Sequence, residues 1–166
     1  LLLMTAGWAT NPIDMSKAGT RAAGNGAWFL GNGANWQTAN YTAATLTPDA
    51  GVYRLGAGGA ANVLQISTTN VLTGSASLVV GNPLARAGLL GGIATGTVNL
   101  NAAQNYTGST TVNRGSQLQI SNTTAQNTVP AGGRLDVSGY FLVSGQYTGT
   151  GPQLAPATFN VFDTGY

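Results

Sequence analysis

Apolar residues recur at every second position in short segments along the chain. The segments contain the pairs Leu64 and Ile66, Leu78 and Val80, Val98 and Leu100, Leu118 and Ile120, and Leu135 and Val137. Successive side chains of a strand point to opposite faces, so this spacing predicts strands with one face on a core and intervening residues facing outward. We expect buried, stacked rows formed by Leu64, Leu78, Val98, Leu118 and Leu135.

Clusters of turn-forming residues separate these segments. Examples are Gly56–Gly59, Gly81–Pro83, Gly91–Gly92 and Pro130–Gly133. Gly, Pro and Asn favour tight turns, and no sustained 3.6-residue stripe accompanies them. The one helical candidate, Pro83–Leu90, is short and bounded by glycines. The pattern therefore predicts an all-β protein with almost no helix.

The spacing of the segments suggests a repeat. Leu78, Val98 and Leu118 follow one another at equal steps of 20, and Leu135 follows at a step of 17. The similar sequences LQISTT and LQISNTT, which begin at Leu64 and Leu118, lie 54 apart, as three coils of 18 would. A period of this size is typical of solenoids. We predict a right-handed parallel β-helix, or β-solenoid, with coils of about 17–20 residues; the alternative is an antiparallel β-sandwich.

The composition fits stacked strands. Only 6% of the residues are charged, whereas the uncharged polar residues Thr and Asn are abundant. Stacked coils place equivalent side chains in rows about 4.8 Å apart, where like charges repel but uncharged polar groups do not. We therefore interpret the low charge as a requirement of the architecture. We treat residues 1–50 as an aromatic-containing segment or cap and residues 51–166 as the repeat region of one continuous domain.

The composition also excludes several kinds of chemistry. Without Cys or His, the chain has no disulfide, no thiolate or imidazole metal site and no Ser/His/Asp triad. Its net charge of +2 is too small for a positively charged surface that binds nucleic acid. Its apolar start is too short to span a membrane. The carboxylates are Asp14, Asp49, Asp136 and Asp163.

These carboxylates do not suggest an active site. A glycoside hydrolase needs two of them about 5 to 9.5 Å apart, and nothing in the sequence brings Asp136 and Asp163 together. We expect Asp136 to face outward from a strand and Asp163 to lie in a turn, and we expect neither an enzyme nor a cofactor. The glycines of Gly56–Gly59 predict a turn rather than a phosphate-binding loop. Calcium binding through Asp and carbonyl oxygens stays open.

Aromatic residues are concentrated in the first quarter of the chain. They include Trp8, Trp28 and Trp36. We favour the interpretation that these tryptophans pack over an open end of the stack, where apolar rows must be shielded from water. The alternative is that they are exposed and bind a ligand such as a glycan.

One segment resembles a known family. The sequence from Thr97 to Ile120 reads TVNLNAAQNYTGSTTVNRGSQLQI, with an alternating strand, an NYTG turn, a TTV strand, a glycine and a further strand. It resembles the autotransporter-associated β-strand repeat of bacterial surface proteins. The resemblance is good over this segment and looser over Ala27–Gly139. It implies a parallel β-helix, a location outside the cell and usually no catalysis in the repeat.

The two ends suggest self-association. An apolar run of Leu1, Leu2, Leu3 and Met4 opens the sequence, and a strand candidate containing Phe159 and Phe162 lies near its end. Because edge strands have unpaired backbone groups, we predict that copies of the chain assemble head to tail into filaments. The alternative is that both ends result from excision from a longer protein, whose next coils would cover them. We expect a non-catalytic extracellular or bacterial cell-surface protein, either a spacer or a fibre subunit. An adhesin that binds glycan or another cell is the alternative.

Overall fold

The described part of the chain is built mainly from short parallel β-strands. The structure is a computed structural model, and it describes residues 2–4, 7–17, 28–32, 36–59, 61–83, 96–121, 134–143 and 158–161. In these segments there is no α-helix, and η1 (Met15–Lys17) is one turn of 3-10 helix. The prediction of an all-β protein is confirmed.

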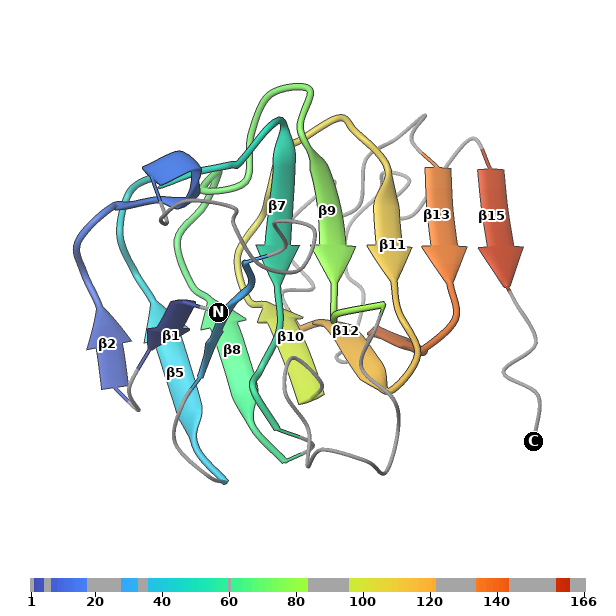
Figure 1. The fold of residues 1–166 in the computed structure, drawn as a ribbon, viewed down its shortest axis with the longest axis horizontal. Helices are drawn as coiled ribbons and strands as arrows, with labels where there is room; N and C mark the ends of the chain where they lie inside the picture. The colour runs from blue at the N-terminus through green and yellow to red at the C-terminus, as the bar shows by residue number, and fades with distance from the viewer. Residues whose placement is uncertain are drawn as a thin grey trace.

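The strands form three sheets. The seven-stranded sheet has the order β1 (Leu2–Met4), β4 (Leu30–Asn32), β7 (Val52–Leu55), β9 (Ser77–Val80), β11 (Thr110–Val112), β13 (Arg134–Val137) and β15 (Thr158–Val161). The six-stranded sheet has the order β14 (Tyr140–Val143), β12 (Ser116–Ile120), β10 (Gly96–Leu100), β8 (Val63–Ile66), β5 (Thr38–Tyr41) and β2 (Gly7–Ala9). The two-stranded sheet pairs β3 (Ile13–Asp14) with β6 (Leu46–Thr47). Figure 1 shows strands of the two larger sheets as two rows that run along the long axis of the molecule.

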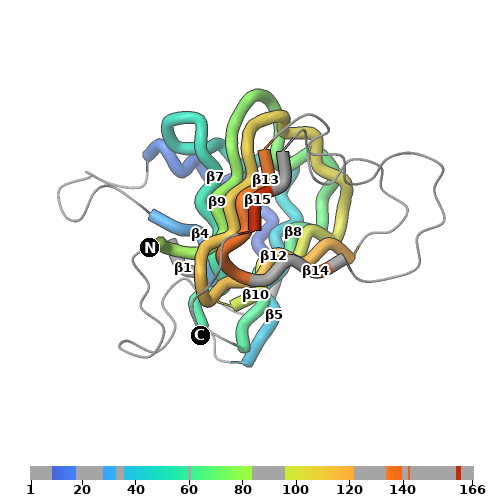
Figure 2. Tube along the Cα trace, turned by 90° about the vertical axis from the view of Figure 1, so that its right-hand side faces the viewer, coloured from blue at the N-terminus to red at the C-terminus, as the bar shows by residue number. Residues whose placement is uncertain are grey.

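Successive strands of the chain belong alternately to the two larger sheets. We call the stretch of chain that contributes one strand to each of these sheets a passage. After β6 the strands fall alternately in the seven-stranded and the six-stranded sheet, from β7 to β15. Each strand pairs with a strand from the previous or next passage, and all these pairings are parallel. Viewed along the stack, the strands of each sheet lie one behind another (Figure 2). The antiparallel β-sandwich considered above is therefore wrong.

The length of one passage through both sheets varies more than the sequence suggested. Val98 pairs with Leu118, 20 positions later, as predicted. Leu64, however, pairs with Val98, 34 positions later, so the two LQIS segments lie two passages apart rather than three. Leu78 is in the other sheet and pairs with Tyr53, 25 positions earlier. The predicted coil length of about 17–20 residues holds for the step from Val98 to Leu118 but is wrong for the other two, because the connections differ in length.

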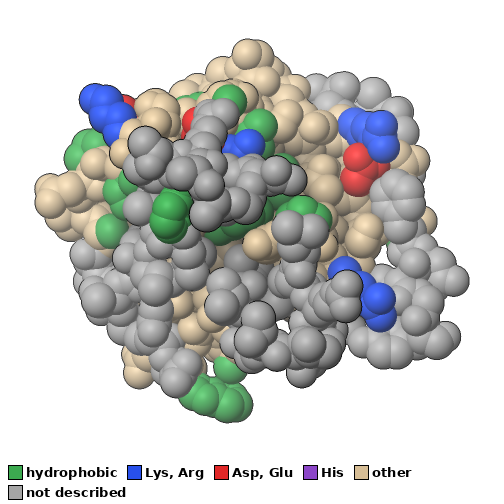
Figure 3. All heavy atoms as spheres, in the orientation of Figure 1, with side chains coloured by type: hydrophobic (Ala, Val, Ile, Leu, Met, Phe, Trp, Pro, Cys, Tyr) green, Lys and Arg blue, Asp and Glu red, His purple; other side chains and the backbone are tan. Residues whose placement is uncertain are grey.

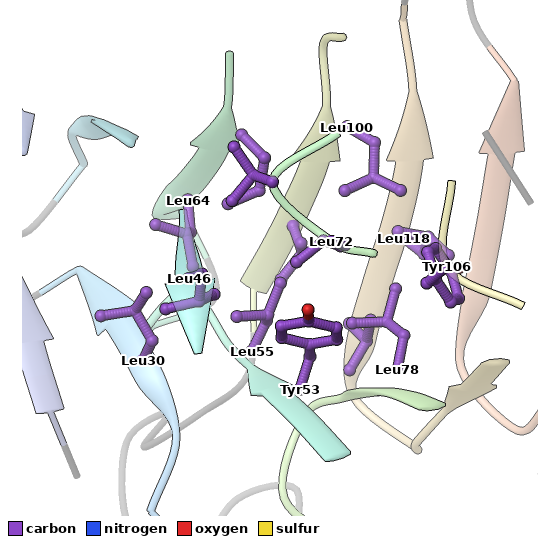
Figure 4. Close-up of a cluster of buried hydrophobic side chains, with 14 of the residues drawn as sticks. Leu30, Leu46, Tyr53, Leu55, Leu64, Leu72, Leu78, Leu100, Tyr106 and Leu118 are labelled. Carbon is purple, nitrogen blue, oxygen red and sulfur yellow. The ribbon is translucent and has the colours of Figure 1, made fainter. Parts of the chain in front are cut away.

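The core lies between the two larger sheets. The five residues predicted to be buried are all buried, and they form two rows: Leu64, Val98 and Leu118 in one sheet, and Leu78 and Leu135 in the other. Figure 4 shows the leucines from both sheets pointing toward one another. Burial of apolar surface at about 25 cal/mol per Å² makes this interior the main source of stability.

Three buried tyrosines extend the core. Tyr41, Tyr53 and Tyr106 are almost completely buried, and each hydroxyl has a hydrogen-bond partner. The Tyr41 hydroxyl donates to the Thr45 carbonyl at 2.6 Å and accepts from the backbone N–H of Ile13. Burial raises the pKa of Tyr41, so this hydroxyl stays protonated and keeps its role as a donor.

The Gly56–Gly59 segment is a tight corner, as expected. Gly58 has φ of +82°, and a Cβ there would lie 2.1 Å from the carbonyl oxygen of Asn32. Only glycine combines this conformation with so close an approach of two backbones. The corner thus packs against the end of β4.

Neither sheet has a break near residue 50. Strands β4 and β5 of the first fifty residues pair with β7 and β8, which follow residue 50. The expected cap and repeat regions therefore share both larger sheets. Most of the helical candidate Pro83–Leu90 lies outside the described residues. The described residues contain no helix with the length and apolar character that a membrane span requires.

Candidate functional site

The outer face of the six-stranded sheet carries a row of hydrogen-bonded amides. Asn40, Gln65 and Asn99 occupy equivalent positions on β5, β8 and β10. The Gln65 Nε2 donates to Asn40 Oδ1 at 2.8 Å, and the Asn99 Nδ2 donates to Gln65 Oε1 at 3.2 Å. The hydroxyl of Ser121 extends the row by donating to Asn99 Oδ1 at 2.7 Å. This polar ladder satisfies the expectation that uncharged side chains stack along the sheet.

Each described carboxylate is held by a neighbour close in sequence. Asp49 pairs with Arg54 at 3.3 Å, Asp136 with Arg134 at 2.7 Å, and Asp14 with Lys17 at 3.6 Å. Among the residues that the structure describes, no group of three carboxylates is arranged to hold a metal ion. Asp163 lies outside the described residues.

The local partners explain the acidity of two of these groups. The Ser16 hydroxyl donates to the Asp14 carboxylate at 2.6 Å and lowers the pKa of that carboxyl. Desolvation opposes the ionisation of Asp136, but hydrogen bonds from Arg134 and Asn160 outweigh it and lower its pKa below the usual value. Both carboxylates are therefore ionised near neutral pH, where a proton donor of the glycosidase type would have to be protonated. As expected, Asp136 lies on the outer face of a strand.

Two buried asparagines hold the corner that leads into β5. Asn32 and Asn62 are both buried, and Asn62 Nδ2 donates to the carbonyl oxygen of Asn32 at 3.4 Å. Asn32 Nδ2 donates to the Gln37 carbonyl at 2.6 Å, and Asn62 Oδ1 accepts from the backbone N–H of Trp36 at 2.7 Å. We call these two residues the asparagine clamp. It fixes the backbone of Trp36 and Gln37.

Trp36 itself projects into solvent. Its side chain is 83% exposed and its φ is +58°, in the left-handed region. Bulky side chains rarely adopt this conformation, which glycine and asparagine tolerate better. With so little of the side chain covered, the interpretation that the tryptophans pack over the core does not hold for Trp36.

The other two tryptophans differ from it. Trp28, which precedes β4, is 38% exposed. Trp8 lies in β2, where it pairs with Asn40, and its side chain is outside the described part. The sequence analysis gave the three tryptophans one role, whereas the fold places them in a strand, before a strand and at a corner. The turn-forming sequence GNGAN before Trp36 was the available signal that this tryptophan lies at a corner.

The residues predicted to self-associate lie mainly in edge strands. Leu2, Leu3 and Met4 form β1, which pairs with β4. The apolar start is thus part of the seven-stranded sheet. Phe159 lies in β15, where it pairs with Leu135. Leu1 and Phe162 are outside the described residues.

Charged side chains are few on the described surface. On the face shown in Figure 3, charged side chains occupy a few small groups. Large hydrophobic side chains are exposed at four described positions: Trp28, Trp36, Leu142 and Val161. Within the described residues, the uncharged polar row, the clamped tryptophan and the sheet edges are surfaces that contacts can use.

Comparison of the chain with models of protein families, with curated protein sequences and with solved structures found no match.

Proposed function

We propose that this chain is a non-catalytic structural protein built as a right-handed β-solenoid, and that it acts outside a bacterial cell as a spacer or fibre subunit. The observation that carries the proposal is the alternation of the strands between two parallel sheets from β7 to β15. Stacked coils produce this order, because each coil contributes one strand to each sheet. The right-handed sense follows from the strong preference of parallel crossovers for that hand.

The extracellular location rests on the resemblance of Thr97–Ile120 to the autotransporter-associated β-strand repeat. The turn tyrosine of that segment, Tyr106, is buried in the core, and its strand residues Val98, Val112 and Leu118 are buried as well. The segment is therefore a structural unit, as a repeat would be. Antibody labelling of intact cells that produce the protein tests the location. We expect intact cells to be labelled, and labelling only after the cells are opened would contradict the proposal.

The sheet edges support assembly into fibres. In the described residues, β1 and β2 each lie at one end of a sheet, while β15 and β14 lie at the opposite ends. The strand order is the same in both sheets, so a second copy could continue the two sheets at once with parallel pairing. We propose that a second copy of this chain occupies these edges, through Leu2, Leu3 and Met4 on one side and β15 on the other.

Electron microscopy and fibre diffraction test the assembly. We expect unbranched filaments of the purified protein, with a reflection near about 4.8 Å along the fibre axis because the strands lie across it. Removal of residues 1–4 should shift the protein toward monomer in sedimentation, while the loss of β1 should remove only a small part of the β-sheet signal in circular dichroism. A monomer at high micromolar concentration, or equal assembly of the truncated chain, would contradict the proposal of fibres.

A further inference from the structure

We propose that Trp36 is the stacking residue of a binding site for a neutral glycan, at the corner between β4 and β5. The inference does not depend on fibre formation, because it concerns a corner rather than the sheet edges. It rests on the conformation of Trp36, on the asparagine clamp and on the chemistry of the adjacent residues.

The left-handed conformation of Trp36 does not bury its indole. Its side chain is 83% exposed, and its backbone adopts φ of +58°. Glycine or asparagine would occupy this turn with less strain. Residues with strained backbone conformations are typical of binding sites, where the surrounding structure holds them in place.

The asparagine clamp supplies that support. The Trp36 N–H donates to Asn62 Oδ1 at 2.7 Å, and both Asn32 and Asn62 are buried beneath the corner. A glycine at position 59 allows this packing, since a Cβ there would lie 3.2 Å from Asn62 Nδ2. The indole is thus attached to a rigid backbone, so less conformational freedom is lost when a ligand binds.

The adjacent residues favour a neutral sugar over a protein partner. Gln37 and Thr38 are both exposed next to Trp36, and Asn40 follows at the next outward position of β5. No charged residue lies between Trp28 and Pro48 in the sequence. An aromatic face beside amide and hydroxyl groups offers a sugar ring both an apolar surface and hydrogen bonds. A protein interface would instead need a contiguous apolar patch at its centre.

Binding can be tested by nuclear magnetic resonance on the intact chain. The probes are hexamers of glucose, of N-acetylglucosamine and of mannose, and the readout is the indole N–H signal of Trp36. We expect at least one hexamer to shift this signal in a saturable way. Trp36→Ala should weaken that binding at least about tenfold, whereas Trp36→Phe should retain it within about threefold. Trp28→Ala is the matched control and should bind as the parent does.

A thermal melt separates a binding role from a structural one. Trp36→Gly should melt at the same temperature as the parent or higher, because it relieves the left-handed strain, and it should not bind the hexamers. No shift with any of the three hexamers, or equal binding by Trp36→Ala, would overturn the proposal. A clearly lower melting temperature of Trp36→Gly would also overturn it, as would self-association that depends on Trp36.

Discussion

Val161 continues the buried row of Val137 on the next strand, yet Val137 is 5% exposed and Val161 is 69% exposed. The two residues are direct partners in parallel pairing between β13 and β15. The exposure differs because β15 is the last described strand of the seven-stranded sheet, so no further described strand covers Val161. An apolar side chain at such an edge is available for contact with another strand.

Val161→Lys should therefore prevent the proposed fibres without unfolding the protein. A charge at the edge strand opposes strand addition, whereas an exposed substitution changes the free energy of unfolding by only about 0.5 kcal/mol. Sedimentation measures the assembly and urea unfolding measures the stability. The control is Ser75→Lys, which adds the same charge at an exposed turn residue between β8 and β9. Fibres of Val161→Lys that equal those of the control would contradict this prediction.

Leu118→Asp should destabilise the protein strongly. Leu118 is completely buried between Val98 and the next strand of its sheet, so the carboxylate would lie in an apolar row. A buried charge without a partner costs about 3–5 kcal/mol, measurable by urea unfolding. Gln117→Asp, on the opposite face of the same strand, should cost less than about 1 kcal/mol. Similar losses for the two variants would show that the inward face has been assigned wrongly.

Gly58→Ala should cost more than Gly74→Ala. Both glycines have positive φ, but only the Cβ at Gly58 would meet another atom, the Asn32 carbonyl oxygen. We expect a loss of about 1 kcal/mol for Gly74→Ala from conformation alone, and of about 3 kcal/mol for Gly58→Ala. The difference between the two losses of unfolding free energy, measured by thermal or urea unfolding, gives the cost of the clash between the added Cβ and the backbone of β4. Equal losses would mean that the corner moves freely away from β4.

The contribution of Asp136 to stability should depend on pH. Its pKa is lowered in the folded protein, because hydrogen bonds from Arg134 and Asn160 outweigh the desolvation of the carboxylate. The stabilisation is therefore fully present above the pKa of the unfolded chain, about 4, and is lost as the pH falls through the lower folded value. Asp136→Asn should be less stable than the parent at pH 7, and the difference should disappear in acid. A difference that stays constant down to pH 2 would contradict this linkage.

The alternation of apolar residues was sufficient to predict the strands and their inward faces. Leu64 and Ile66, for example, are buried while Gln65 joins the outer ladder. This succeeds because a strand turns every second side chain to the same face, whatever lies around it. The parallel arrangement also followed from the repetition of similar segments.

The spacing of the segments failed for a physical reason. Connections between strands are not constrained by the pairing, so the longer passage from Leu64 to Val98 and the shorter one from Val98 to Leu118 both join equivalent positions. The segment from Leu78 to Val98 leads from one sheet to the other and is not a repeat. The exposure of Trp36 depends on how a corner packs, which alternation does not encode.

The ladder of Asn40, Gln65 and Asn99 has a consequence for the solutions in which this protein can remain folded. Its contacts join neutral amides, so dissolved sodium chloride has little charge to screen along this face. A sheet joined by surface ion pairs loses part of its cohesion as the Debye length shortens, to about 3 Å at 1 M salt. We therefore expect the outer face of this sheet to keep its cohesion from dilute fresh water to brine.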